Sequence, residues 1–228
     1  MKRSPFYFEI KDVLIQFIAA FDDIVISRYN KEKIAQNDIP VRYVYSPKQR
    51  VVHDLINKAR HITLPAVAVS IKSVDYDKDR VFNKIEGSYY NRTDVFQGHE
   101  MNTITDHLFQ PTPVKIEVNM SILTRYQTDM DQILSNFIPY NNPYIVISWK
   151  TPPEILQHQQ EIRSEVEWSG SMNMDYPTDM SSSEVYRISA DTSFTIKSWL
   201  FRHKDDPKGN IFTINSFFTP MSGIEGLS

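Results

Sequence analysis

The sequence contains no cysteine and little glycine, and both shortages exclude classes of functional site. With 0 Cys in 228 residues, the chain has no disulfides, no thiolate metal ligands and no cysteine nucleophile. Only 6 Gly are present, and the closest pair is Gly223 and Gly226. Because loops that cradle phosphates need clustered glycines, we do not expect a nucleotide-binding loop.

Long apolar runs and an excess of basic charge are also missing. Glu9, Lys11 and Asp12 interrupt the apolar amino-terminal segment, and no stretch approaches the roughly 18 uncharged apolar residues that span a bilayer. The 25 Lys and Arg against 28 Asp and Glu give a net charge of −3, unlike a DNA-coating protein. We therefore expect a soluble protein, made and used in a cytoplasm, with no membrane or sequence-specific nucleic acid as partner.

The composition predicts a folded α+β protein. The hydrophobic share of 41% and the charged share of 23% are ordinary for globular domains. Domains commonly have about 100–200 residues, so residues 1–228 are interpreted as a single domain. The expected architecture is a mixed, mostly antiparallel sheet with long protruding strands and about three covering helices.

Apolar residues spaced three and four positions apart predict the helices. This spacing occurs from Ile10 to Phe21, in a short segment after Ser46, and from Met130 to Ile138. Ser46 and Gln49 also fit a capping box for the second helix, in which each side chain bonds the other residue's backbone amide.

Alternation of apolar and polar residues predicts the strands. It is clear at 114–122 and runs through 162–176 and 186–200. At about 3.3 Å per residue, the 162–176 stretch alone would extend for roughly 50 Å. Strands of that length outgrow a compact core, so we predict a protruding β-ribbon around 162–202 that packs on another subunit. The segment around 75–113 is polar and is predicted to be a long irregular loop.

Two groups of residues in that predicted loop suggest metal binding. His99 and His107 lie with two acidic residues, and Asp75, Asp77 and Asp79 follow the spacing of a calcium loop. However, Arg80 stands where a calcium loop needs Gly, and polar loops collect such residues by chance. A metal-dependent enzyme using the His99/His107 loop remains an alternative, but we expect no catalytic residue, cofactor or metal.

Aromatic side chains are the candidate interface anchors, because such residues are enriched at the energetic centres of protein interfaces. The candidates are Trp168, Trp199, Phe201, Phe212, Phe217 and Phe218. Taken individually, however, each is more typical of a core residue than of an interface residue.

Three blocks of sequence carry a family resemblance. They are VNMSILTRYQTDMDQILSNFIPYNNP from Val118, IPVRYVYSPKQ from Ile39 and VEWSGSMNMDYP from Val166. In order and spacing, these blocks resemble the tail sheath stabilisers, or proximal tail completion proteins, of T-even-type contractile-tailed phages.

The resemblance implies a structural protein of the virion that forms a hexameric ring and has no catalytic residues. The ring would sit at the head-proximal end of the tail, with DNA passing through its lumen, and would be assembled in the host bacterial cytoplasm. Its partners would be the tail terminator, the sheath and the neck proteins. A tail tube terminator or a neck ring protein is the alternative within this class.

Overall fold

The computed structural model describes residues 6–30, 32, 34–57, 63–81, 87–96, 99–153, 155, 160–176, 187–202 and 208–209. The sequence predicts a single domain, whereas contacts between residues divide the chain into two compact units. The first unit comprises 1–84 and 111–203, and the second comprises 85–110 and 204–228.

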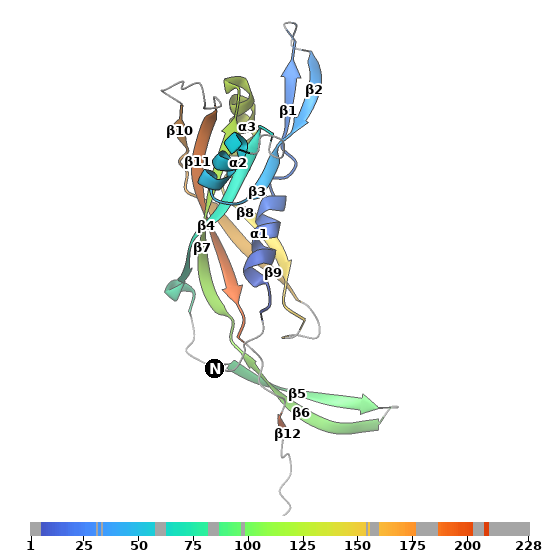
Figure 1. The fold of residues 1–228 in the computed structure, drawn as a ribbon. Coiled ribbons are helices and arrows are strands. Elements are labelled where there is room, and N and C mark those ends of the chain that lie inside the picture. Colours follow the sequence, from blue (N-terminus) through green and yellow to red (C-terminus); the bar gives the residue numbers. More distant parts are fainter. Residues whose placement is uncertain are drawn as a thin grey trace, which may run out of the picture. The chain divides into compact units, whose positions relative to one another are not determined.

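The first unit is built on a seven-stranded sheet (Figure 1). Its strands, in spatial order, are β3 (Arg42–Tyr45), β4 (Ala66–Tyr76), β7 (Thr112–Thr124), β11 (Ile188–Leu200), β9 (Glu161–Trp168) and β8 (Ile145–Lys150), with β10 (Asn173–Asp175) also paired to β11. Only the β3–β4 pair is parallel among the described strands. The predicted mixed, mostly antiparallel α+β architecture is therefore confirmed.

Three α-helices and a separate hairpin complete this unit. The helices are α1 (Glu9–Ala19), α2 (Lys48–Asn57) and α3 (Gln127–Tyr140), and a 3-10 turn, η1, spans Lys78–Arg80. The hairpin pairs β1 (Val25–Tyr29) with β2 (Ala35–Pro40). The predicted capping box of α2 is wrong, because the Ser46 hydroxyl has no hydrogen-bond partner in the structure.

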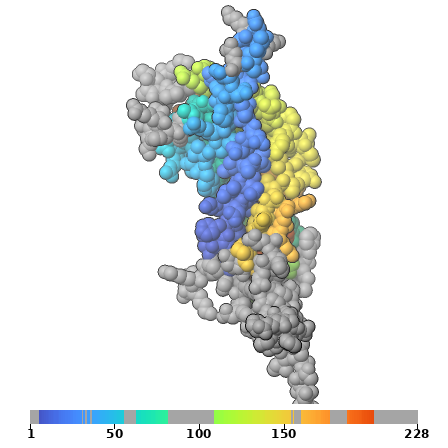
Figure 2. All heavy atoms as spheres, turned by 90° about the vertical axis from the view of Figure 1, so that its right-hand side faces the viewer, coloured from blue at the N-terminus to red at the C-terminus, as the bar shows by residue number. Residues whose placement is uncertain are grey.

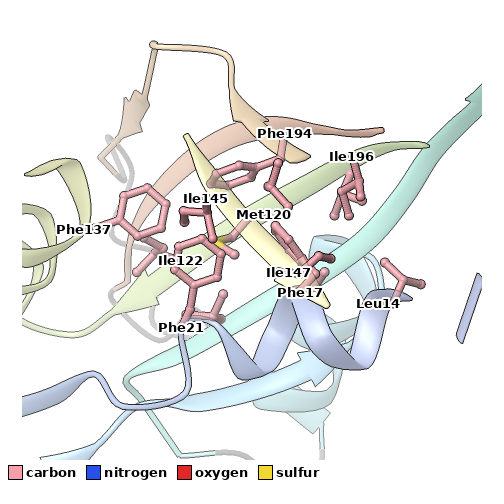
Figure 3. Close-up of a cluster of buried hydrophobic side chains, with 14 of the residues drawn as sticks. Leu14, Phe17, Phe21, Met120, Ile122, Phe137, Ile145, Ile147, Phe194 and Ile196 are labelled. Atoms are coloured by element: carbon pink, nitrogen blue, oxygen red, sulfur yellow. The ribbon is translucent and has the colours of Figure 1, made fainter. Parts of the chain in front are cut away.

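One face of the sheet carries the main hydrophobic core. The alternating apolar side chains of β7 and β11 point to this face and meet those of α1 and α3. Phe17, Phe21, Phe137 and Phe194 form its aromatic centre (Figure 3). The Phe194 ring contacts all three others, with ring centroids 5.2 Å from Phe17, 5.5 Å from Phe21 and 5.9 Å from Phe137.

The opposite face of the sheet is mostly polar. At one end, α2 covers a small apolar cluster of Val51, Ala68 and Leu123. Beyond it, Lys72 pairs with Glu117 at 2.7 Å across β4 and β7. An antiparallel sheet can leave one face open to solvent in this way.

The strands predicted to form a protruding ribbon lie inside the sheet. β11 is bordered by β7 on one side and by β9 and β10 on the other, so its edges are covered within the subunit. The described strands of the 162–202 segment, β9, β10 and β11, therefore belong to the sheet and do not form a protruding ribbon. Their apolar face is covered by α1 and α3 of the same chain.

The long strand predicted at 162–176 is divided by a bulge. From Trp168 to Asn173 the chain advances five residues, whereas their partners Phe194 and Asp191 are three residues apart. The two extra residues are accommodated at Gly170, whose φ of 76° suits glycine. Because an insertion of two residues preserves the alternation of faces, the sequence pattern continues through the interruption.

The prediction of an irregular loop at 75–113 is also wrong. This segment holds the end of β4, the η1 turn, β5 (Gly87–Phe96), β6 (His99–Phe109) and the start of β7. β5 and β6 form an antiparallel hairpin, and the short β12 (Lys208–Gly209) pairs with β6. The sequence did not predict these strands, because their polar composition gives no clear alternation of apolar and polar residues.

Candidate interaction surfaces

Three of the predicted interface aromatics pack partly buried inside the first unit. The indole N–H of Trp168 donates to the Thr192 hydroxyl at 2.6 Å, and Arg80 stacks 4.8 Å from the centre of the Trp199 ring. The Phe201 ring lies 6.3 Å from that of Trp149. Trp168, Trp199 and Phe201 therefore contribute to packing within the subunit. Phe212, Phe217 and Phe218 lie outside the described residues.

The two histidines of the predicted metal loop are far apart. His99 and His107 both lie on β6, eight residues from each other. At about 3.3 Å per residue, they are separated by roughly 26 Å along an extended strand. A single metal ion cannot bind both, so the metal-dependent enzyme built on His99 and His107 is wrong. Within the described ranges, no cluster of three or more metal-ligating side chains occurs.

The acidic group of the predicted calcium loop is part of a buried ion-pair network. Asp77 is only 2% exposed and accepts from Arg80 Nε at 2.6 Å. Lys115 Nζ lies 3.1 Å from the other Asp77 oxygen. Arg80 also donates to the backbone carbonyls of Val114 and Ser198, at 2.6 Å and 2.9 Å. This Arg80 network joins the η1 turn to the ends of β7 and β11.

The pKa of Asp77 gives a prediction for acid stability. Burial raises this pKa, but hydrogen bonds from Arg80 and Lys115 outweigh burial and hold it below its ordinary value of 3.8. A lowered folded-state pKa stabilises the fold above pH 3.8, and that stabilisation is lost as the pH falls through the folded-state pKa.

We therefore expect Asp77→Asn to be less stable than the unmodified chain at pH 7, with a difference that shrinks below pH 3.8. Urea unfolding at several pH values between about 7 and 2 measures this difference. A difference that stays constant across this range would contradict the assigned ion pairs.

The open face of the sheet carries locally balanced charge. Lys197 of β11 bonds both Glu165 and Glu167 of β9, at 3.1 Å and 2.6 Å. The bond to Glu167, with that to Glu165, raises the pKa of Lys197. At the α2 end of this face, Lys48 bonds Asp191 at 2.7 Å beside a polar cavity of about 310 Å³. On this face Lys48 and Lys197 are therefore both paired with carboxylates.

The β1–β2 hairpin exposes apolar side chains. Tyr29 and Ile34, near its turn, are each 57% exposed. The hairpin is fixed to α3 by a bond from the Ser27 backbone N–H to Gln132 at 3.0 Å and by the Arg28–Asp129 ion pair at 3.4 Å. Exposed apolar groups on an anchored element are typical of a protein-binding surface. This surface was not predicted from the sequence, because a strand pattern does not show which apolar side chains stay uncovered.

A third surface is the groove between α1 and the outer edge of β8. It has a volume of about 430 Å³ and is lined by Ile15 and Gln16 of α1 and by 148–153. Figure 2 shows α1, in dark blue, beside the yellow surface that contains β8. Ile15 is 49% exposed in this groove. We call this feature the α1–β8 groove.

Comparison with known proteins identifies the family of the chain. Residues 6–225 match the T4-like virus Myoviridae tail sheath stabiliser family. The chain belongs to the tail sheath stabiliser family. It is therefore a structural phage tail protein and not an enzyme, as the sequence predicted.

A curated relative agrees with this family. The chain is 26% identical, over 111 residues, to the tail completion protein gp15 of Enterobacteria phage T4. The matched stretch is 48% of this chain and 40% of the relative, so the chain matches less than half of the relative's length. No helix in the described part of the chain is long and apolar enough to cross a membrane.

Proposed function

We propose that this protein forms a hexameric ring at the head-proximal end of a contractile tail. In this position it keeps the last sheath ring extended and joins the tail to the neck. Membership of the tail sheath stabiliser family over residues 6–225 carries the proposal. The partners are further copies of the chain, the tail terminator, the sheath and the neck proteins, which assemble in the host bacterial cytoplasm.

The exposed surfaces support a role in protein assembly. A cyclic ring requires two different surfaces on each subunit, because each copy contacts its neighbours head to tail. The β1–β2 hairpin and the α1–β8 groove are separate surfaces with exposed apolar side chains. The aromatic residues predicted as interface anchors remain proposed contributors to contacts with other subunits: Trp168, Trp199, Phe201, Phe212, Phe217 and Phe218.

The charge of the protein is compatible with a ring through which DNA passes. The net charge is −3, and the lysines Lys72 and Lys197 on the open face of the sheet are paired with glutamates. A basic lumen would retain the duplex through its phosphates. We therefore propose a neutral or acidic inner wall.

Sheath survival tests the proposed function. Tails assembled without this protein should lose their extended sheath, because the last sheath ring would lack its cover. Adding the purified protein during assembly should restore extended sheaths, counted by negative-stain microscopy over time. Equal survival with and without the protein would contradict the proposal. Binding to bare tubes as readily as to sheathed tails would instead favour the tube-terminator alternative.

A further inference from the structure

Among the described residues, no strand pairs with the outer edge of β8. β8 ends the sheet order, and β9 is its only strand partner among the described residues. The Thr151 backbone N–H donates to the Gln160 carbonyl at 2.9 Å, so this pair is hydrogen-bonded in the β8–β9 register. Such pairs recur every second residue in an antiparallel ladder. The N–H and C=O groups of Val146, Ser148 and Lys150 therefore point away from β9.

These backbone groups lie where a further strand could be added. Ser148 and Lys150 line the α1–β8 groove, and Ile15 of α1 forms part of its other wall. Val146 is 52% exposed on the same strand. An extended segment in the groove would pair its backbone with β8 and place alternate side chains against α1. This combination of main-chain bonds and side-chain pockets is the usual form of strand addition.

We infer that the α1–β8 groove receives strand β5 of a second copy of this chain. The inference rests on the proposed ring, in which each subunit must offer one surface and receive another. The occupant must be extended and long enough to follow β8 from Val146 to Lys150. β5 is an edge strand of the smaller sheet and has 10 residues. β3, which lies at the opposite edge of the main sheet from β8, has only 4.

The second unit also has a physical reason to bind another chain. Its described part consists of the β5–β6 hairpin and the two-residue β12. A two-stranded hairpin is at best marginally stable in water, and added strands or packing stabilise it. Pairing β5 with β8 of a neighbour would extend the small sheet by the whole sheet of that subunit. It would also cover two edges that otherwise stay open to unwanted pairing.

Proline at Ser148 tests the pairing directly. The Ser148 N–H points away from β9, so Ser148→Pro removes an outward donor while the β8–β9 bonds remain; proline is tolerated at such edge positions. We expect a melting temperature close to that of the unmodified chain. The fraction of protein assembled into rings should fall at least tenfold, because the proline ring also blocks an incoming strand. Ser148→Ala keeps the N–H and should assemble normally. Mass measurement by light scattering, with and without tails, gives the assembled fraction.

Engineered cysteines identify the strand that enters the groove. Because the chain has 0 Cys, new disulfides have no competing thiol. Ser148→Cys on one copy should cross-link, after mixing and oxidation, to cysteine at Asn91, Thr93 or Val95 of β5 on another copy. Thr195→Cys, on a central strand of the open face, serves as the control and should not cross-link to them.

The outcomes separate this inference from the proposed function. Rings that form equally with Ser148→Pro, or that form without any β8–β5 cross-link, would overturn the inference and leave the ring intact. Cross-links to Tyr29→Cys of the β1–β2 hairpin would show that a different segment fills the groove. Failure of the unmodified chain to form rings, alone or on tails, would reject the proposed ring and the inference together.

Discussion

Replacing Phe194 with alanine is expected to lower the free energy of unfolding by about 3–5 kcal/mol. The Phe194 side chain is 1% exposed, and its ring contacts those of Phe17, Phe21 and Phe137. These partners come from α1, the segment after it and α3, so the cavity left by alanine cannot be closed by one neighbour. Urea unfolding, followed by circular dichroism, measures the change.

Thr195→Val is the matched control for this substitution. Thr195 is the next residue of β11 and points to the open face of the sheet. Valine keeps the branched shape favoured in strands, so we expect a change of about 0.5 kcal/mol or less. If Phe194→Ala and Thr195→Val lowered the free energy of unfolding equally, the two faces of β11 would have been assigned incorrectly.

Arg80→Met is expected to produce the second large loss of stability. Arg80 neutralises the buried Asp77, donates to the Val114 and Ser198 carbonyls, and stacks on Trp199. Methionine keeps much of the side-chain volume but leaves the Asp77 carboxylate with Lys115 as its only cationic partner in the Arg80 network. Removing one partner of a buried charge is costly, because the remaining charge has lost its water as well.

Lys72→Met provides the comparison for Arg80→Met. Lys72 pairs with Glu117 on the open face, where solvent screens the interaction. We expect the urea midpoint to fall several times further for Arg80→Met than for Lys72→Met. Similar shifts would show that the Arg80 network contributes no more than a surface ion pair.

Local patterns in the sequence predicted the buried faces well. The three- and four-residue spacing in the first helix selected Val13, Leu14 and Phe17, which are buried in α1. Alternation selected the inward residues of β7 and β11, because side chains on a strand alternate between faces whatever the neighbouring strands are. The alternation of faces also continues beyond the bulge at Gly170, because two inserted residues do not change which face a later residue occupies.

The neighbours of each strand could not be predicted in the same way. Pairing of β11 with both β7 and β9 joins segments that are distant in the sequence, and no local pattern encodes that order. The length of the alternation at 162–176 therefore suggested a protrusion, although the strand is covered within its own subunit. The sequence also could not predict that β8 is an edge strand, because edge position depends on the order of all strands in the sheet.

The candidate site was predicted only at the level of the family. The blocks that begin at Val118, Ile39 and Val166 indicated a tail sheath stabiliser, and the match over residues 6–225 confirms that family. The interface residues did not follow from the resemblance, because exposure is set by tertiary packing. Trp168 and Trp199 are suitable residue types for an interface, yet both make hydrogen bonds or ring contacts inside the subunit.

Imaging the head-proximal ends of tails shows whether this protein forms the proposed ring there. Sheathed tails prepared without this protein would be examined by electron microscopy before and after the purified chain is added, with symmetry determined from end-on and side views. We expect an added six-fold ring on the last sheath ring of each extended tail. Tail ends that remain unchanged, with the protein left free in solution, would contradict the proposed ring.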